Sequence, residues 1–165
     1  MVNIQIADSL SLEINTELLE EAALATLRLS GSSPEAEITI LLTDDAQMQQ
    51  LNSQFLGVDA PTDVLSFPTG QFPATGFTSD DFPGDFIDPD THKPYLGDIA
   101  ISCPRAQVQA SSAGNSLIDE LRLLVVHGTL HLLGYDHAEP DEKADMWALQ
   151  SQVLSQLGCD IFNFL

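Results

Sequence analysis

The chain has 165 residues, of which 25 are acidic and only five are basic, and its formal charge at pH 7 is −20. A chain of this length forms one domain and buries about two thirds of the surface that its unfolded form exposes. Its acidity repels anionic lipid and nucleic acid, and no apolar run approaches the roughly 18 residues that span a bilayer, so composition alone excludes membrane, DNA and RNA partners.

The N-terminal part predicts a strand followed by a helix. Residues 2–7 alternate apolar and polar side chains, which is typical of a half-buried strand. Asn15 or Thr16 offers an N-cap, and apolar residues then recur at helical spacing until Gly31. The chain is therefore expected to open with one strand and one helix.

The next segments repeat this alternation and add a third strand. Residues 37–43 are rich in Ile and Leu and predict a strand, after which Thr43 offers the N-cap of a helix that ends at Gly57. Residues 62–67 predict another strand, which Pro68 closes because proline has no N–H to donate to a neighbouring strand.

Residues 68–94 interrupt the regular pattern. They contain five prolines and three glycines, so neither a helix nor a strand is expected there. We interpret the segment as a solvated insertion, with a lid beside the functional site as the alternative. Residues 96–102 then restore a strand pattern, and Pro104 suits the first turn of a helix that reaches about Ala113.

Two helices complete the predicted fold. Ser116 followed by Asp119 resembles a capping box and marks the start of a long helix. Residues 139–157 predict the last helix, with an apolar stripe at helical spacing. Together with the earlier segments, these elements give four strands and about five helices.

Three of the four histidines lie within the eleven residues 127–137. Residues four apart share one face of a helix, so His127 and His131 can bind the same ion. Gly134 can end the helix in a left-handed conformation and let His137 return as a third ligand. Three neutral imidazoles leave a fourth position open for water, as in catalytic zinc sites. The sequence thus predicts a metal site, with zinc as the first choice and copper, nickel or iron as alternatives.

Two other interpretations of these histidines are weaker. Unliganded histidines between apolar runs would have to lose their charge or find hydrogen-bond partners on burial. One class of zinc peptidases shares the histidine spacing, but its second motif position is a glutamate that serves as general base. This chain has Gly128 there, which cannot accept a proton, so the metal is expected and a protease is disfavoured.

Two motifs point to a known family. One is the segment 127–137, HGTLHLLGYDH, and the other is the segment 59–68, DAPTDVLSFP, with the shorter LGDI at 96–99 between them. In these motifs and in the order of its elements, nearly the whole chain resembles the YbeY endoribonucleases. Members of that family are metal-dependent factors of ribosomal RNA maturation, acting at the 3′ end of 16S rRNA, and of ribosome quality control in bacteria.

The resemblance implies an α+β fold in a single domain, 1–165, with a four-stranded mixed sheet packed against about five helices. It also implies a zinc ion at the end of a central helix, held by His127, His131 and His137 beside a groove for single-stranded RNA. The family has an arginine where this chain has Leu56. Leucine can neither bind phosphate nor stabilise a charged transition state, so no catalytic arginine is carried over.

The expected chemistry is metal-assisted, in-line attack of water on an RNA phosphodiester. By their position in the second motif, Asp63 and Ser66 are candidates for the lining of the groove. Asp136 is a candidate partner that orients a ligand imidazole, which is a common arrangement around zinc-bound histidines.

The acidic composition limits how the substrate can be bound. A ribosome or a basic ribosomal protein that presents the RNA would complement an acidic surface. One alternative is a ribosome-associated binding factor with a structural or inactive metal site, and a weaker one is a zinc metallopeptidase. The two cysteines form no CxxC pair and the N-terminus has no basic region before a long apolar one, so we expect a cytoplasmic protein.

Overall fold

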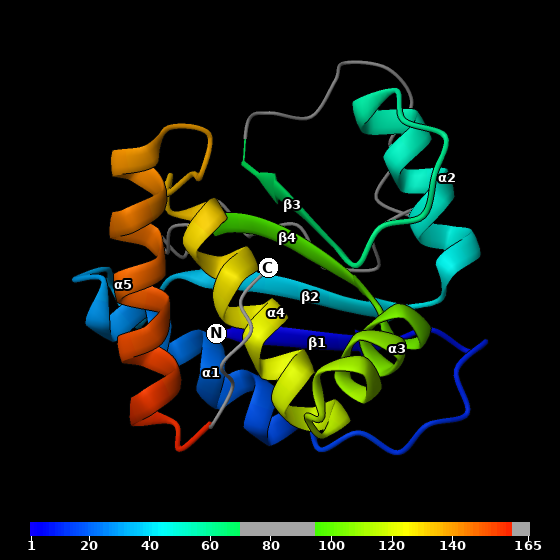
Figure 1. Ribbon diagram of the computed structural model, residues 1–165, viewed down its shortest axis with the longest axis horizontal. Helices are drawn as coiled ribbons and strands as arrows, with labels where there is room; N and C mark the ends of the chain where they lie inside the picture. The colour runs from blue at the N-terminus through cyan, green and yellow to red at the C-terminus, as the bar shows by residue number, and fades with distance from the viewer. Residues whose placement is uncertain (70–94, 160–165) are drawn as a thin grey trace.

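A computed structural model describes residues 1–69 and 95–159 (Figure 1). The elements follow one another as β1 Val2–Ile6, α1 Thr16–Leu29, β2 Glu37–Thr43, α2 Asp45–Leu56, β3 Val64–Pro68, β4 Tyr95–Ser102, α3 Cys103–Ala113, α4 Leu117–Leu132 and α5 Pro140–Gln156. Among the described residues, no helix combines the length and the apolarity needed to cross a membrane.

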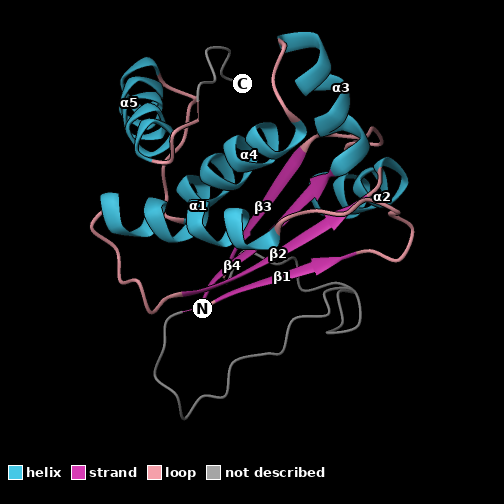
Figure 2. Cartoon of the chain, turned by 90° about the horizontal axis from the view of Figure 1, so that it is seen from below, coloured by secondary structure: helices cyan, strands magenta, loops and turns pink. Residues whose placement is uncertain are grey.

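The four strands form one mixed sheet in the order β1-β2-β4-β3. The pairs β1·β2 and β2·β4 are parallel, whereas β3 runs antiparallel to β4. Helices α1 and α4 lie over one face of this sheet (Figure 2), and α5 packs against both of them. The predicted α+β class, the single domain and the mixed four-stranded sheet are confirmed.

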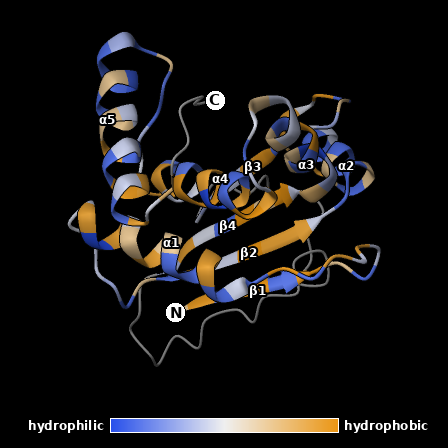
Figure 3. Cartoon of the chain, turned by 60° about the horizontal axis from the view of Figure 1, so that its bottom comes forward, coloured by the Kyte–Doolittle hydropathy of each residue, from blue (hydrophilic) through white to orange (hydrophobic). Residues whose placement is uncertain are grey.

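Alternating residues of the strands separate two cores. Ile40 and Ile99 belong to the larger core, together with residues of α1 and α4. Much of β2 is orange, and therefore hydrophobic, in Figure 3. Leu41 and Ala100, one position further along, face α2 in a smaller core on the opposite side of the sheet. Each fully buried leucine or isoleucine contributes about 1.5–3 kcal/mol, so the larger core holds α4 firmly on the sheet.

The helix ends agree with the expected caps, with small shifts. Ser116 caps α4 through its side chain, which accepts a hydrogen bond from the Asp119 backbone N at 3.3 Å. The cap of α2 is Asp44 and not Thr43, because the Asp44 carboxylate accepts a hydrogen bond from the Gln47 backbone N at 2.8 Å. The carboxylate one residue later is better placed to satisfy the free N–H groups of the first turn.

The predicted segment 68–94 falls almost entirely outside the described residues. Pro68 itself is the last residue of β3, where it pairs with Gly97 at the edge of the sheet. An edge strand tolerates proline because the missing N–H has no partner to lose. The interpretation of the remaining residues as an insertion or a lid stays a prediction.

Candidate metal centre and its pocket

The end of α4 brings two histidines together and the turn after it returns the third. His127 and His131 lie one helical turn apart, with their Nε2 atoms separated by 3.1 Å. The helix ends at Leu132, and Gly134 follows with φ of 96°, a left-handed conformation that favours glycine. The backbone N–H of Tyr135 then donates to the Leu130 carbonyl at 3.0 Å, which fixes the turn that leads to His137.

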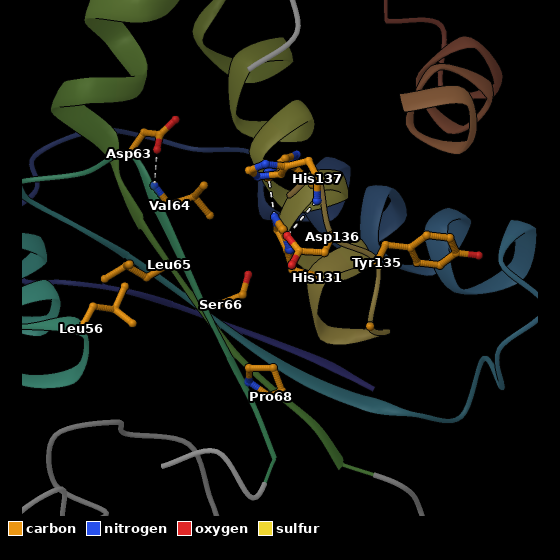
Figure 4. Close-up of a pocket in the computed structure, with 12 residues that line it drawn as sticks. Leu56, Asp63, Val64, Leu65, Ser66, Pro68, His131, Tyr135, Asp136 and His137 are labelled. Carbon is orange, nitrogen blue, oxygen red and sulfur yellow. Dashed lines mark hydrogen bonds between the residues drawn. The ribbon is translucent and has the colours of Figure 1, made fainter. Parts of the chain in front are cut away.

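The three imidazoles form a compact group (Figure 4). The ring of His137 lies 5.6 Å from that of His127 and 5.1 Å from that of His131, measured between centroids. One ligand nitrogen from each ring lies within 4.8 Å of the others. Nitrogens that share a tetrahedral zinc ion lie about 3.3 Å apart, since each Zn–N bond is about 2.0–2.1 Å. The cluster therefore has the donors and nearly the spacing to hold one metal ion.

Burial keeps the deeper imidazoles neutral, as metal binding requires. His127 is only 4% exposed, and its burial lowers its pKa to about 4. Burial is also the main cause that lowers the pKa of His131, and the neighbouring His137 lowers it further. Neutral imidazoles have a lone pair to donate, so His127 and His131 can bind a cation at neutral pH.

Helix α5 supports the cluster from behind, and the sequence did not reveal this. Gln150 places its Oε1 atom 2.9 Å from Nδ1 of His127. Trp147 stands edge-on to His127 and His137, with centroid distances of 5.8 and 5.5 Å, and the Lys143 ammonium lies 5.4 Å from the tryptophan ring. Positions 143, 147 and 150 share a helical face, but only the folded chain shows that this face meets the histidines.

The carboxylate of Asp136 contacts the backbone of the third histidine. Its Oδ1 atom accepts a hydrogen bond from the His137 backbone N at 2.7 Å. This contact stabilises the turn that carries the His137 ring. The expected contact between Asp136 and an imidazole stays a prediction.

A pocket of about 630 Å³ opens beside the histidines. The side chains that line it come from the end of α2, from β3 and the residue before it, and from α4 and its turn: Leu56, Asp63, Val64, Leu65, Ser66, Pro68, His127, His131, Gly134, Tyr135, Asp136 and His137. The structure thus brings both predicted groove residues, Asp63 and Ser66, to the cavity that contains the three histidines (Figure 4).

The two walls of the pocket touch at Gly128. The Ser66 hydroxyl on β3 donates a hydrogen bond to the Gly128 carbonyl on α4 at 3.1 Å. A Cβ atom at Gly128 would lie 2.9 Å from the Ile99 Cγ2 atom and 3.2 Å from the Ser66 hydroxyl. Glycine is therefore what allows α4 to pack this closely on the sheet, and a glutamate at this position would have no room.

The charge of the pocket is unusual for a phosphate-binding site. Asp63 and Asp136 carry the charges among the described lining residues, none of which is a lysine or an arginine. Leu56 lines the opening and is 62% exposed. The Asp63 carboxylate accepts hydrogen bonds from the Val64 backbone N at 2.8 Å and from Gln109 Nε2 at 3.3 Å, so it is held in place on the wall that faces the histidines.

Comparison with known proteins agrees with this geometry. Residues 3–158 match the family model described as Endoribonuclease YbeY. A relative of that name from Roseiflexus castenholzii is 43% identical over 159 residues, which cover 96% of this chain and 93% of the relative. Another from Desulfitobacterium hafniense is 46% identical over 143 residues, covering 87% of this chain and 85% of the relative.

A solved structure shares the fold. The solution structure of a protein from Thermotoga maritima is 24% identical, with a TM-score of 0.58 and coverage of 95% of this chain and 89% of that one. The match of the family model along almost the whole chain and the identity to the curated relatives lead to one conclusion. The chain belongs to the YbeY endoribonuclease family.

Proposed function

We propose that this protein is a metal-dependent endoribonuclease that cleaves single-stranded RNA at the three-histidine site. The observation that carries the proposal is the group of His127, His131 and His137, whose nitrogens lie within 4.8 Å of one another at the side of an open pocket. A bound zinc ion, or another divalent transition metal, would supply Lewis acidity for the attack of water on a phosphodiester.

The residues of the chain have separate roles in this proposal. The three imidazoles bind the ion through neutral nitrogens. Asp136 fixes the backbone of His137 and so orients its ring. Asp63 and Ser66, on the opposite wall, line the groove that receives the RNA strand.

The natural substrate in this proposal is ribosomal RNA within a ribosomal particle. A chain of charge −20, with no lysine or arginine among the described residues of its pocket, repels naked RNA. Basic ribosomal proteins complement such a surface and would deliver the strand to the pocket. In this proposal the protein acts in the cytoplasm, in maturation of the 3′ end of 16S rRNA and in ribosome quality control, as the family resemblance implies.

A second candidate is a ribosome-associated binding factor whose metal site is structural or inactive. Leu56 favours it, because this exposed leucine stands at the pocket where a cation would stabilise phosphate charge. A zinc metallopeptidase is less favoured, since the close contact of Gly128 with Ile99 leaves no space for a general base at that position.

A substrate panel tests these candidates. The zinc-loaded protein is incubated at low and moderate salt with an end-labelled single-stranded RNA, its duplex, the DNA of the same sequence, casein and isolated ribosomal particles. We expect efficient cleavage of exposed rRNA in the particles and weak cleavage of the free single strand, with the duplex, the DNA and casein intact. Binding to particles without cleavage of any RNA would favour the binding factor, and cleavage of casein would favour the peptidase.

A further inference from the structure

Gln150 is a fully buried polar residue that contacts the histidine cluster from outside the pocket. It lies on α5, its side chain is 0% exposed, and it is not among the residues that line the cavity. Its Oε1 atom is 2.9 Å from Nδ1 of His127. The residue therefore meets the ring nitrogen that points away from the other histidines.

The hydrogen bond determines which nitrogen of His127 can bind a metal. An amide oxygen only accepts hydrogen bonds, so Nδ1 of His127 must carry the hydrogen that is donated to Gln150. In the neutral ring, the lone pair then resides on Nε2, the atom that lies 3.1 Å from Nε2 of His131. A donor at position 150 would reverse this and direct a hydrogen into the cluster.

We propose that Gln150 is a positioning residue of the metal centre, which holds His127 in the tautomer and ring orientation that direct its Nε2 lone pair at the ion. This inference rests on the metal site of the proposed function. It adds Gln150 of α5 to the three histidines as a residue that determines how the centre binds a metal ion. Outer partners of this kind alter metal affinity about 10- to 100-fold when they are removed.

The Nε2 atom of Gln150 indicates that this residue does not serve mainly to stabilise the fold. Its Nε2 atom is buried and has no hydrogen-bond partner among the described residues. A buried donor without a partner destabilises the folded state. An apolar side chain of similar shape would remove this cost but would also leave the buried Nδ1–H of His127 without its acceptor, so the two effects largely offset each other in the stability of the metal-free protein.

The neighbouring Trp147 provides a direct readout of the centre. It is the one tryptophan of the chain, and its ring lies 5.8 Å from His127 and 5.5 Å from His137 between centroids. A Co²⁺ ion bound by the histidines will quench its fluorescence and give visible absorption. Zinc affinity follows by competition with Co²⁺.

The test compares Gln150→Met with the wild-type protein, with Thr26→Val as the matched control. Thr26 is equally buried and its hydroxyl donates to the Ala22 carbonyl at 2.8 Å in α1, away from the histidines. We expect Gln150→Met to bind Co²⁺ and Zn²⁺ about 10- to 100-fold more weakly. The metal-free variant should unfold at nearly the wild-type denaturant concentration, because the buried Gln150 Nε2 donor is removed while the His127 Nδ1–H loses its acceptor. Thr26→Val should show the reverse, with lower stability and unchanged metal affinity.

Two further readouts separate positioning from a structural role. The variant Gln150→Glu keeps an acceptor for Nδ1 and should restore metal affinity to the wild-type value or above it. In the metal-free wild type, ¹⁵N chemical shifts of labelled histidine should show His127 as the Nδ1–H tautomer, and Gln150→Met should show a mixture of tautomers. If Gln150→Glu does not fold, the tautomer measurement on Gln150→Met takes its place.

Failure of the inference and failure of the proposed function look different. If the wild-type protein binds neither ion, the metal centre itself is refuted. If the wild type binds metal and Gln150→Met binds it equally well, or if the variant loses stability in proportion to its affinity, the positioning role is wrong and the proposed function stands.

Discussion

The two walls of the pocket differ in how they are built. The histidine wall consists of the end of α4 and its turn, fixed by the larger core on one side and by Gln150 and Trp147 of α5 on the other. The strand wall consists of β3 and the end of α2, where Leu56 is exposed. Only the smaller core lies behind this wall. The histidine wall has the groups that could bind a metal ion, whereas the strand wall is the side on which our proposal places the RNA strand.

From this difference we expect catalysis and substrate affinity to be separable in the molecule. Changes on the histidine wall should abolish metal binding or cleavage. Changes on the strand wall should instead alter how well RNA is bound. The following predictions test that separation, from the largest effect to the smallest.

The largest effect is expected from His131→Ala. Removal of one imidazole leaves two ligands, so the variant should lose its metal ion and all detectable RNA cleavage. Metal content by atomic emission and an RNA cleavage assay on the same sample measure both. Val108→Ala, at an exposed position of α3 that does not line the pocket, serves as the control with metal and activity unchanged. Full metal content in His131→Ala would contradict the tripod.

Gly97→Ala should destabilise the fold at the contact between β4 and β3, and so disrupt the strand wall. Gly97 has φ of 138°, and a Cβ atom there would lie 2.2 Å from the Phe67 carbonyl oxygen of β3. Strain and clash together should lower the free energy of unfolding by about 3 kcal/mol or more, as measured with denaturant. Gly114→Ala is the control, because φ is 76° and the space is open, and it should cost only about 1 kcal/mol. Equal losses would show that the clash is relieved.

Gly128→Ala tests the contact between the walls. The added methyl group must displace Ile99 and the Ser66 hydroxyl by a few tenths of an ångström, at a cost of about 1–3 kcal/mol in stability. We expect one metal ion per chain to remain, since the three histidines keep their turn, while RNA cleavage decreases because the strand wall moves away. If the variant lost its metal ion but cleaved RNA at the wild-type rate, the assignment of metal-dependent cleavage to the histidine wall would be wrong.

The smallest effect is expected from Leu56→Arg. A guanidinium at the pocket should bind one phosphate of single-stranded RNA, raise affinity up to about tenfold at low salt and steepen the log–log salt dependence by about 0.7. Val58→Arg is the matched control, because Val58 is 48% exposed but does not line the pocket. If both variants gain equally, general charge and not the pocket determines RNA binding.

The histidine wall was the more predictable part from sequence. His127 and His131 reveal themselves by helical spacing, and Gly134 marks the turn that returns His137, so local periodicity is enough to define the cluster. The strands and helices followed in the same way from alternation and caps. The shift of the α2 cap to Asp44 shows the usual uncertainty of one residue.

The supporting residues were not predictable for a physical reason. Gln150 lies 23 positions from His127 and meets it only because α5 packs on α4, a relation that no local pattern encodes. The close contact of Gly128 with Ile99 likewise depends on long-range packing. Asp63 and Ser66 were placed in the groove by resemblance, and their positions in the fold depend on long-range contacts of Ser66 with Gly128 and of Asp63 with Gln109.

The most direct test of the account is a zinc titration of RNA cleavage. Metal-free protein receives from zero to two equivalents of Zn²⁺, and cleavage of a single-stranded RNA and of rRNA in isolated ribosomal particles is measured at each step. The account predicts that activity rises in proportion to zinc, reaches a plateau at one ion per chain, and is absent throughout in His131→Ala. Activity that is independent of zinc, or that persists in His131→Ala, would contradict a three-histidine catalytic metal centre.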